Sequence, residues 1–310
     1  MKRNILLLFT FFACITVQGQ TPVRLVDLRS EHLDRPIGLD NPVPRLSWRM
    51  EDGRQGAVQT SWRIVVDEDS LNVVNGCGRM WDSGKNDSRN QLVAYAGKKL
   101  QPFTRYYWKV ICSDMEYKET ASPVSYFETG MMGMQHWQGA WIGDGKDIHY
   151  GPAPYFRKEF KTGKKVKSAR AYIAAAGLYE LYINGEKIGD HCLAPLYTRF
   201  DRRNLYVAYD VTSQLQNGDN AIGVLLGNGW YNHQSKAVWD FDRAPWRNRP
   251  TFCLDLRITY TDGSVETIPT DLSWRTASGA ITFNSIYTGE HYDAPVSYTH
   301  LRAHETCADL

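Results

Sequence analysis

Short stretches that mix β-branched and aromatic residues with polar residues recur along the chain and predict β-strands. In the first 130 residues the clearest of them are 45–50, 61–66 and 105–111. Clusters of Pro, Asp and Asn, such as 40–44, separate these stretches and mark turns. About seven short strands over this length are typical of a β-sandwich. The first part of the chain is therefore expected to be an all-β domain.

A tyrosine stands where one of these strands is expected to begin. Leu100, Pro102 and Thr104 precede Tyr106 at alternate positions, and this spacing resembles the fibronectin type III signature. In such sandwiches the tyrosine hydroxyl bonds back to the backbone just upstream and forms a tyrosine corner. Modules of this kind are mostly structural spacers, so the signature predicts a fold and not a catalytic or binding role.

The same strand pattern resumes in the second half of the chain. The stretches that carry it are 169–176, 179–183, 221–226 and 252–260. Asn184-Gly185 and Asp262-Gly263 lie between strand-like runs and favour type I′ hairpins. Residues 130–133, two glycines around two methionines, are expected to form a hinge. We find no amphipathic helix of core length, so both domains are predicted to be β-sandwiches.

A length of 310 residues suggests two domains, which we place at 20–130 and 134–294. Residues 1–19 have the layout of a secretory signal peptide, with two basic residues followed by an apolar run and a small residue. The protein is therefore predicted to be exported to the periplasm or the extracellular space. Acylation of Cys14 is the less favoured alternative, because the phenylalanines before it fit a lipoprotein signal poorly.

The last sixteen residues, 295–310, show neither turn signals nor strand alternation. They resemble translated sequencing-adapter read-through, and we predict a non-native tail. His300 and His304 would face one side of a helix, which invites a zinc site. We reject that interpretation because a zinc site needs a third ligand and outer residues that orient the ligands, and the segment offers neither.

Composition excludes several classes of function. The chain has 36 Lys+Arg against 34 Asp+Glu, a net charge of +2, which gives no electrostatic footprint for nucleic acid. No apolar stretch is long enough for a membrane span. Aromatic residues make up 13% of the chain, which suits β-rich domains and sugar-binding surfaces alike. The cysteines between leader and tail form no paired motif and are expected to be buried free thiols. They are Cys77, Cys112, Cys192 and Cys253.

One segment combines aromatic and polar side chains in the way that sugar sites do. Asn228, Trp230 and Tyr231 lie in a glycine-bracketed stretch, and Asp240 follows nine residues later. Aromatic faces bind the C–H surfaces of a sugar, and fixed polar groups bind its hydroxyls. We therefore take these four residues as candidate carbohydrate contacts. The structural alternative is that Trp230 and Tyr231 fill the end of the sandwich while Asp240 and Asp242 cap a turn.

A carboxylate pair, Glu290 and Asp293, invites a glycosidase assignment, because these enzymes use two carboxyl groups. Sequence spacing gives no separation between the two groups, and a strand and turn with solvated charges is the favoured interpretation. The sequence contains no glycine-rich nucleotide-binding loop, no Gly-x-Ser-x-Gly nucleophile motif and no His-Glu-x-x-His zinc motif.

Taken together in order, the motifs resemble the amino-terminal region of bacterial α-L-rhamnosidases of glycoside hydrolase family 78. The segments that carry the resemblance are 27–33, 38–48, 177–185, 193–195, 209–212, 220–231 and 286–294. The resemblance implies an immunoglobulin or fibronectin type III-like module followed by a jelly-roll-like β-sandwich. In that family, further β modules and a catalytic (α/α)6 barrel follow, and the barrel is absent from this sequence.

The resemblance also implies an activity for the parent protein, the hydrolysis of terminal α-L-rhamnosyl groups with inversion. An inverting glycosidase uses an acid and a base about 6.5–9.5 Å apart. In this family both come from the barrel, so no catalytic residue is assigned here, and the chain alone is expected to be inactive and to need no catalytic cofactor. The alternatives are a rhamnose-binding module, which some members form with a calcium ion, and a scaffold for the missing catalytic domain. Rhamnose-containing glycans are the expected partners.

Overall fold

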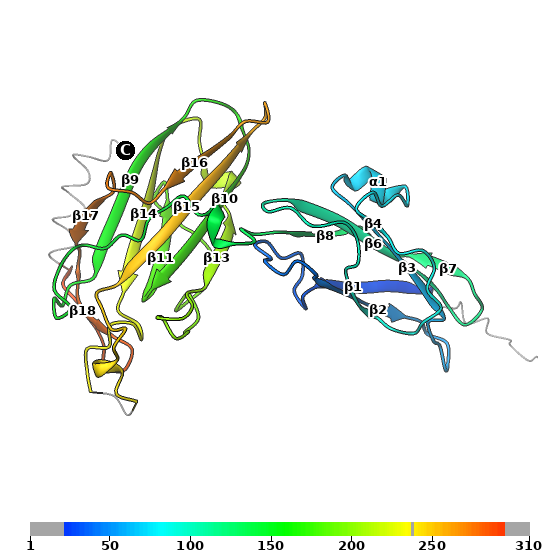
Figure 1. Cartoon of the computed structure of the whole chain (residues 1–310), viewed down its shortest axis with the longest axis horizontal. Coiled ribbons are helices and arrows are strands. Elements are labelled where there is room, and N and C mark those ends of the chain that lie inside the picture. The colour runs from blue at the N-terminus through cyan, green and yellow to red at the C-terminus, as the bar shows by residue number, and fades with distance from the viewer. Residues whose placement is uncertain (1–21, 237–238, 295–310) are drawn as a thin grey trace, which may run out of the picture. The chain divides into compact units, whose positions relative to one another are not determined.

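The computed structural model describes residues 22–236 and 239–294 (Figure 1). The described chain forms two compact units. The first contains residues 22–36, 41–100 and 104–127, and the second contains 37–40, 101–103 and the remainder from 128 onward. Two short segments from the first third of the sequence therefore belong to the second unit. The predicted leader and tail lie outside the described residues.

The first unit consists of two antiparallel sheets and one short helix. One sheet has the order β1-β2-β5, and the other has the order β4-β3-β6-β7, with β8 also paired to β6. The elements are β1 (Arg24–Ser30), β2 (Arg45–Glu51), β3 (Ser61–Asp67), α1 (Ser70–Val74), β4 (Trp81–Asp82), β5 (Leu92–Ala94), β6 (Arg105–Ser113), β7 (Glu119–Ala121) and β8 (Ser125–Glu128). Trp48 of β2 and Trp62 of β3 pack edge to face between the two sheets, with ring centroids 6.2 Å apart.

The three strands predicted most clearly in this unit are β2, β3 and β6, and each is present within two residues of its expected bounds. Tyr106 is the second residue of β6 and is fully buried. Its tyrosine-corner hydrogen bond stays a prediction. An all-β fold is confirmed for this unit.

The second unit is also built from antiparallel strands, in two larger sheets and a hairpin. One sheet has the order β13-β10-β15-β16, the other β12-β11-β14-β9-β17, and β18 pairs with β19. Its strands are β9 (Pro154–Thr162), β10 (Val166–Ala176), β11 (Leu178–Ile183), β12 (Glu186–Lys187), β13 (Tyr206–Asp210), β14 (Gly218–Gly227), β15 (Thr251–Tyr260), β16 (Val265–Pro269), β17 (Arg275–Ser278), β18 (Ile281–Ser285) and β19 (Gly289–Tyr292). Three 3-10 turns complete it, at η1 (Met134–His136), η2 (Thr212–Gln214) and η3 (Phe241–Arg243).

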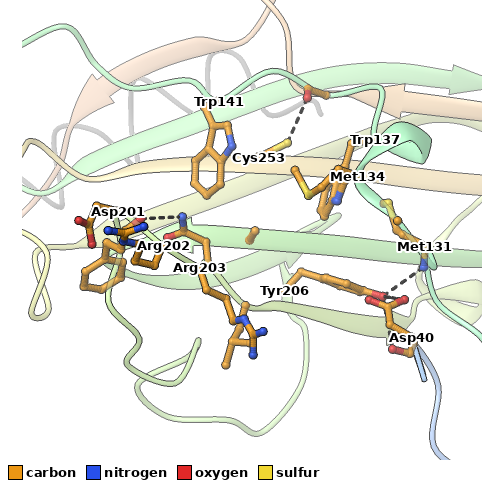
Figure 2. A pocket seen from close by; sticks show the side chains of 17 residues that line it. Asp40, Met131, Met134, Trp137, Trp141, Asp201, Arg202, Arg203, Tyr206 and Cys253 are labelled. Atoms are coloured by element: carbon orange, nitrogen blue, oxygen red, sulfur yellow. Dashed lines mark hydrogen bonds between the residues drawn. The ribbon is translucent and has the colours of Figure 1, made fainter. Parts of the chain in front are cut away.

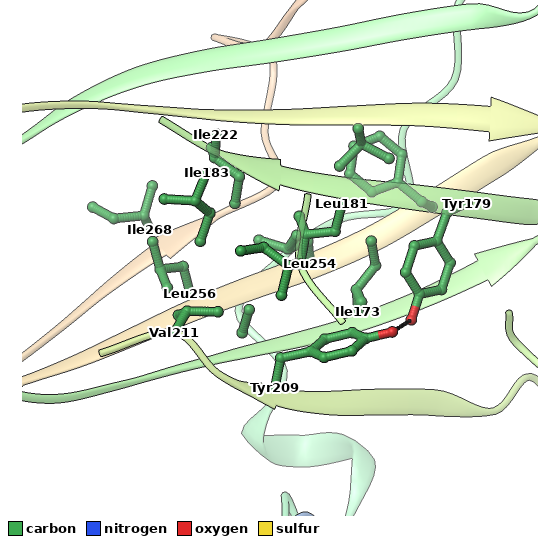
Figure 3. Packing of buried hydrophobic residues seen from close by; sticks show 14 of the residues in the cluster. Ile173, Tyr179, Leu181, Ile183, Tyr209, Val211, Ile222, Leu254, Leu256 and Ile268 are labelled. Carbon is green, nitrogen blue, oxygen red and sulfur yellow. Dashed lines mark hydrogen bonds between the residues drawn. The ribbon is translucent and has the colours of Figure 1, made fainter. Parts of the chain in front are cut away.

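The core of this unit lies between its two sheets (Figure 3). Ile173 of β10 and Leu254 of β15 point into it from one sheet, and Leu181 of β11 points into it from the other. Along β11 and β14 buried positions alternate with half-buried ones, as expected when one face of a sheet meets the core. These strands confirm the second predicted all-β domain.

Strands β10 and β15 are buried on both faces, since short segments of the same unit cover the outer side of their sheet. Phe103 contacts Tyr172 with ring centroids 5.5 Å apart. Glu128 forms a buried ion pair with Arg170 at 2.7 Å. The predicted hinge is hydrogen-bonded in this covering layer, where the amide of Met131 donates to the Tyr206 hydroxyl at 3.1 Å. Coverage on both faces explains the uninterrupted apolar run 171–176 in β10.

Of the two predicted type I′ hairpins, one is confirmed and one is wrong. Asn184 and Gly185 both have left-handed φ angles, +50° and +83°, as a type I′ turn requires. At the other turn only Gly263 is left-handed, with φ +84°. Its amide donates to the carbonyl of Tyr260 at 3.0 Å, so a type I turn is followed by a left-handed glycine. The extra residue in this connection accounts for the difference.

The four cysteines between the predicted leader and tail are free thiols, as expected. Cys112 and Cys253 are buried, whereas Cys77 and Cys192 are exposed. The expectation of burial was therefore wrong for two of the four, because both exposed cysteines lie in connections outside the strands. In residues 22–236 and 239–294, no helix is both long enough and apolar enough to cross a membrane.

Candidate functional site

Aromatic side chains from three connections, β12–β13, β14–β15 and β18–β19, meet beside the end of β14. We call this group the aromatic cluster, and its members are Tyr197, Phe200, Trp230, Tyr231, His233, Phe241, Trp246 and Tyr287. The Trp230 ring lies edge-on to Phe241 and Tyr287, with centroids 5.4 and 5.3 Å apart. The cluster thus joins two predicted contacts, Trp230 and Tyr231, to aromatic residues far away in sequence.

Gly229 lets the chain turn between these predicted contacts. Its φ is +51°, and a Cβ at this position would lie 2.9 Å from Cγ of Leu178. Glycine avoids both the strained backbone and the close approach. The turn leaves Trp230 and Tyr231 half-buried at the rim of the sandwich.

Asn228 supports this loop from inside. It is 2% exposed, and its side-chain amide donates to the carbonyl of Asn284 at 2.9 Å. Its Oδ1 accepts from the amide of Asn232 at 3.1 Å. Since both ends of the carboxamide are used within the protein, Asn228 positions the loop and has no surface to offer a sugar.

Tyr231 packs flat against Trp246, with centroids 6.3 Å apart and an interplanar angle of 9°. Burial raises the pKa of its phenol above the ordinary value. These contacts agree with the structural alternative, in which the aromatic side chains fill the end of the sandwich. Trp230 and Tyr231 nevertheless keep part of their surface accessible.

Asp240 is exposed and has a left-handed φ of +51° at the start of η3. Its carbonyl accepts from the amide of Arg243 at 2.9 Å, whereas its side chain makes no capping hydrogen bond. The structural alternative predicted that the Asp240 side chain caps a turn, and that prediction was wrong. Oδ1 of Asp242 is buried and has no hydrogen-bond partner among the described residues.

His233 is the most deeply buried member of the cluster, at 1% exposed. Its ring stacks on Trp230 with centroids 6.0 Å apart, and its Nε2 lies 3.3 Å from Oγ of Ser235. Burial lowers the pKa of the imidazole below its usual value. The ring is therefore neutral at pH 7 and acts as part of the aromatic packing.

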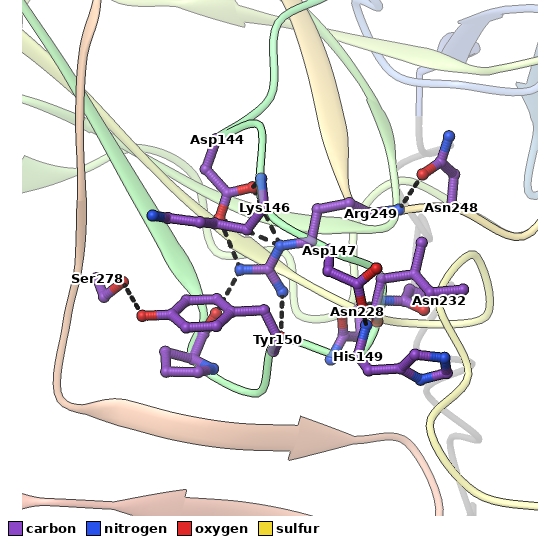
Figure 4. A network of polar contacts seen from close by, with 12 residues as sticks. Asp144, Lys146, Asp147, His149, Tyr150, Asn228, Asn232, Asn248, Arg249 and Ser278 are labelled. Atoms are coloured by element: carbon purple, nitrogen blue, oxygen red, sulfur yellow. Dashed lines mark hydrogen bonds and ion pairs between the residues drawn. The ribbon is translucent and has the colours of Figure 1, made fainter.

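A buried ion pair holds two loops together next to the cluster (Figure 4). The side chains of Arg249 and Asp144 are 5% and 6% exposed, and their charged atoms are 2.7 Å apart. Arg249 also donates to the carbonyl of Tyr150 at 2.7 Å. The amide of Asn232 reaches the same loop at the carbonyl of Ile148, 3.0 Å away. Loop 143–152 is thereby fixed against the segment that carries Trp230.

Calcium binding at the aromatic cluster stays a prediction. Calcium takes six to eight oxygen ligands. Across 22–236 and 239–294, no group of three or more His, Cys, Asp or Glu side chains could hold a metal ion. Asp240 and Asp242 supply two carboxylates, and Oδ1 of Asn228 is already engaged. The binding proposal below assigns no role to calcium.

The segment that carries the carboxylate pair Glu290 and Asp293 contributes an aromatic residue, and not these carboxylates, to the aromatic cluster. Glu290 is exposed on β19, opposite Asn284 of β18. The backbone amide of Asp293 donates to the carbonyl of Ala280 at 2.8 Å. Tyr287, in the turn between these strands, reaches the cluster. Sequence reasoning missed Tyr287, Tyr197 and Phe200, although each stands in a segment whose aromatic content was visible.

Two family models match the chain, one for each unit. The model of the Rha78A-like N-terminal immunoglobulin domain matches residues 25–133. The model of the α-L-rhamnosidase N-terminal domain matches residues 164–306.

Curated relatives and solved structures agree with these models. An α-L-rhamnosidase of Formosa agariphila is 33% identical over 94% of this chain and 34% of its own length. One of Alteromonas sp. is 31% identical over 83% of this chain and 29% of its own. The solved α-L-rhamnosidase of Dictyoglumus thermophilum superposes with a TM-score of 0.81 at 38% identity, over 88% of this chain and 32% of that one.

The chain thus spans about a third of the length of the curated relatives it matches. Together, the ordered motifs, the two all-β units and both domain matches lead to one assignment. The chain belongs to the α-L-rhamnosidase family, as an amino-terminal region made of a Rha78A-like immunoglobulin domain and an α-L-rhamnosidase N-terminal domain.

Proposed function

We propose that this chain is the amino-terminal part of an exported α-L-rhamnosidase that removes terminal α-L-rhamnosyl groups with inversion. One observation carries the proposal: relatives named α-L-rhamnosidase match 83–96% of this chain. They extend well beyond the matched region. The acid and base of the reaction belong, in this proposal, to a carboxy-terminal catalytic domain, and the two β units support that domain.

The proposed chemistry predicts both the reaction product and the location of the activity. In an inverting reaction, water attacks the anomeric carbon from the face opposite the leaving group, so an α-L-rhamnoside yields β-L-rhamnose first. We expect the full chain to release no rhamnose from an aryl α-L-rhamnoside. A longer product, encoded by the locus resequenced past the codon for Ala294, is expected to release it.

Proton NMR during the reaction identifies the first anomer formed. Rhamnose release by this chain alone would contradict its inactivity. Initial formation of the α anomer by the longer product would overturn inversion, and absence of any release by that product would overturn the rhamnosidase proposal itself.

A second function, rhamnosyl binding at the aromatic cluster, is favoured by the partly accessible aromatic rings beside an exposed carboxylate. In this proposal a sugar ring stacks on Trp230 or Tyr231, and Asp240 accepts hydrogen bonds from its hydroxyls. The carboxylate of Asp240 is exposed and makes no capping bond, so it is available to a ligand. Asn228 acts indirectly, by holding the loop.

Replacing Trp230 by alanine is expected to weaken L-rhamnose binding about tenfold, since the loss of an aromatic contact of about 1.4 kcal/mol lowers the affinity by that factor. Isothermal titration calorimetry measures the change, with and without added calcium. Trp239→Ala serves as the control, since Trp239 is 72% exposed and lies outside the cluster. Absence of heat in both conditions would reject the binding function and leave the scaffold role. A requirement for calcium would contradict the metal-free site.

A further inference from the structure

A hollow of about 960 Å³ opens on the outer face of the β13-β10-β15 sheet (Figure 2). Ala174, Tyr206 and Cys253 line it from the three strands. Burial raises the pKa of the Cys253 thiol to about 11, so the thiol is neutral at pH 7. All the lining residues belong to the second unit. The hollow is as large as pockets that hold small ligands.

Two tryptophans line one side of the hollow. Trp141 is 44% exposed, and Trp137 packs edge-on against Tyr206 with centroids 5.7 Å apart. The backbone that carries them is pinned to β15, because the amides of Gln138 and Gly139 both donate to the carboxylate of Asp255 at 2.8 Å. The aromatic faces are thus in place before any ligand arrives.

Two arginines line the hollow from the loop before β13. The amides of Arg202 and Arg203 donate to the carbonyl of Arg199 at 2.9 and 3.0 Å, which shapes this loop. Among the described residues, neither the Arg202 nor the Arg203 side chain forms an ion pair within 4.0 Å of a carboxylate. The nearby Asp201 is already paired with Arg199 at 2.8 Å.

The remaining carboxylate in the lining is also engaged. Asp40 accepts hydrogen bonds from the Tyr206 hydroxyl at 2.8 Å and from the amide of Met132 at 2.7 Å. The lining therefore contains two arginines and two tryptophans, and among the described residues neither arginine has a carboxylate partner. Because Arg199 offsets Asp201, Arg202 and Arg203 face the single remaining negative charge of Asp40.

We propose that this hollow binds an acidic saccharide, with a sugar ring on the face of Trp141 and a carboxylate held by the guanidinium group of Arg202 or of Arg203. Tryptophan faces suit the C–H surfaces of a pyranose, and the planar guanidinium fork suits a carboxylate. The site goes beyond the proposed function, because it needs neither rhamnosidase activity nor rhamnosyl binding at the aromatic cluster. It assigns this domain a preference for uronate-bearing glycans.

Calorimetry with the full chain tests the proposal, using trigalacturonate and trimannuronate against their carboxyl-reduced neutral counterparts. We expect saturable binding of at least one uronate at low ionic strength and at least tenfold weaker binding of its neutral counterpart. The double variant Arg202→Gln, Arg203→Gln and the single variant Trp141→Ala are each expected to weaken uronate binding by about tenfold. The control variant Trp239→Ala replaces an exposed tryptophan outside the hollow and is expected to leave uronate binding unchanged.

Thermal melts followed by circular dichroism confirm that each variant stays folded, as expected for residues on the surface. Absence of saturable binding by both uronates overturns the proposal. Equal affinity for acidic and neutral trisaccharides, or equal loss in Trp141→Ala and Trp239→Ala, also overturns it. None of these outcomes bears on rhamnose release by a longer product, so the two proposals fail separately.

Discussion

Replacing Arg249 by methionine is expected to destabilise the second unit by about 3–5 kcal/mol, because the change leaves a buried carboxylate without its partner. Asp144 is 6% exposed, and Arg249 reaches it through both Nε and Nη2 at 3.1 and 2.7 Å. The carbonyl of Tyr150 loses a charged donor as well. Methionine fills part of the volume but supplies none of these hydrogen bonds.

Chemical denaturation followed by tryptophan fluorescence measures the loss of unfolding free energy. Lys161→Met is the matched control, because Lys161 and Asp219 form an ion pair in which both side chains are 79% exposed. Such a pair contributes about 0–1 kcal/mol. Adding Asp144→Leu to Arg249→Met is expected to recover part of the loss, since no buried charge then remains. A loss below about 1 kcal/mol in the single variant would contradict this role for the ion pair.

The same variant connects stability to the candidate site. Loop 143–152 contacts the segment after β14 through Asn232, so loosening that loop should also loosen the turn that carries Trp230. The aromatic cluster is therefore held from beneath by polar contacts. A sugar that binds there meets rings whose positions are fixed in advance, which lowers the cost of ordering them on binding.

The strands were predictable because their signal is local. In β11 alternate residues face the core, so the periodicity of two was visible in the sequence. The turn at Asn184-Gly185 was predictable for a similar reason, since few residues tolerate two successive left-handed φ angles. The turn at Gly263 has one extra residue, and the dipeptide alone does not reveal that difference.

The convergence of distant loops was not predictable from local pattern. Nothing near Phe103 indicates that it covers the outer face of a strand seventy residues away, at Tyr172. The role of Asn228 was hidden for the same reason. A carboxamide in a glycine-rich loop looks available to a ligand until Asn284 and Asn232 are known to use both of its ends.

Replacing Asp67 by asparagine is expected to destabilise the first unit by about 2–3 kcal/mol at neutral pH. Asp67 ends β3 and its side chain is 1% exposed. Its carboxylate accepts hydrogen bonds from the backbone amides of Asp69 and Arg79, both at 2.9 Å. The Arg79 guanidinium adds two more contacts at 3.0 Å. The variant loses the negative charge that strengthens all of these bonds.

The effect of Asp67 on stability is expected to depend on pH in a defined direction. Burial alone would raise the pKa of this carboxyl, but Arg79 and the backbone amides outweigh it and hold the pKa well below its usual value. A depressed folded pKa means that the charge stabilises the unit above the unfolded pKa of about 4, and that the contribution fades as pH falls through the folded pKa. The difference between wild type and Asp67→Asn should therefore be constant near neutral pH and shrink below about pH 4.

Measuring the difference between the two proteins isolates Asp67, because every other carboxyl titrates in both. Chemical denaturation followed by circular dichroism, repeated between about pH 3 and pH 7, gives the curve. Asp34→Asn is the control, since the Asp34 side chain is 74% exposed and only loosely paired with Arg35 at 3.6 Å; it should change stability by less than about 0.5 kcal/mol. A difference that stays the same down to pH 3 would show that hydrogen-bond geometry, and not the buried charge, stabilises the junction between β3 and α1.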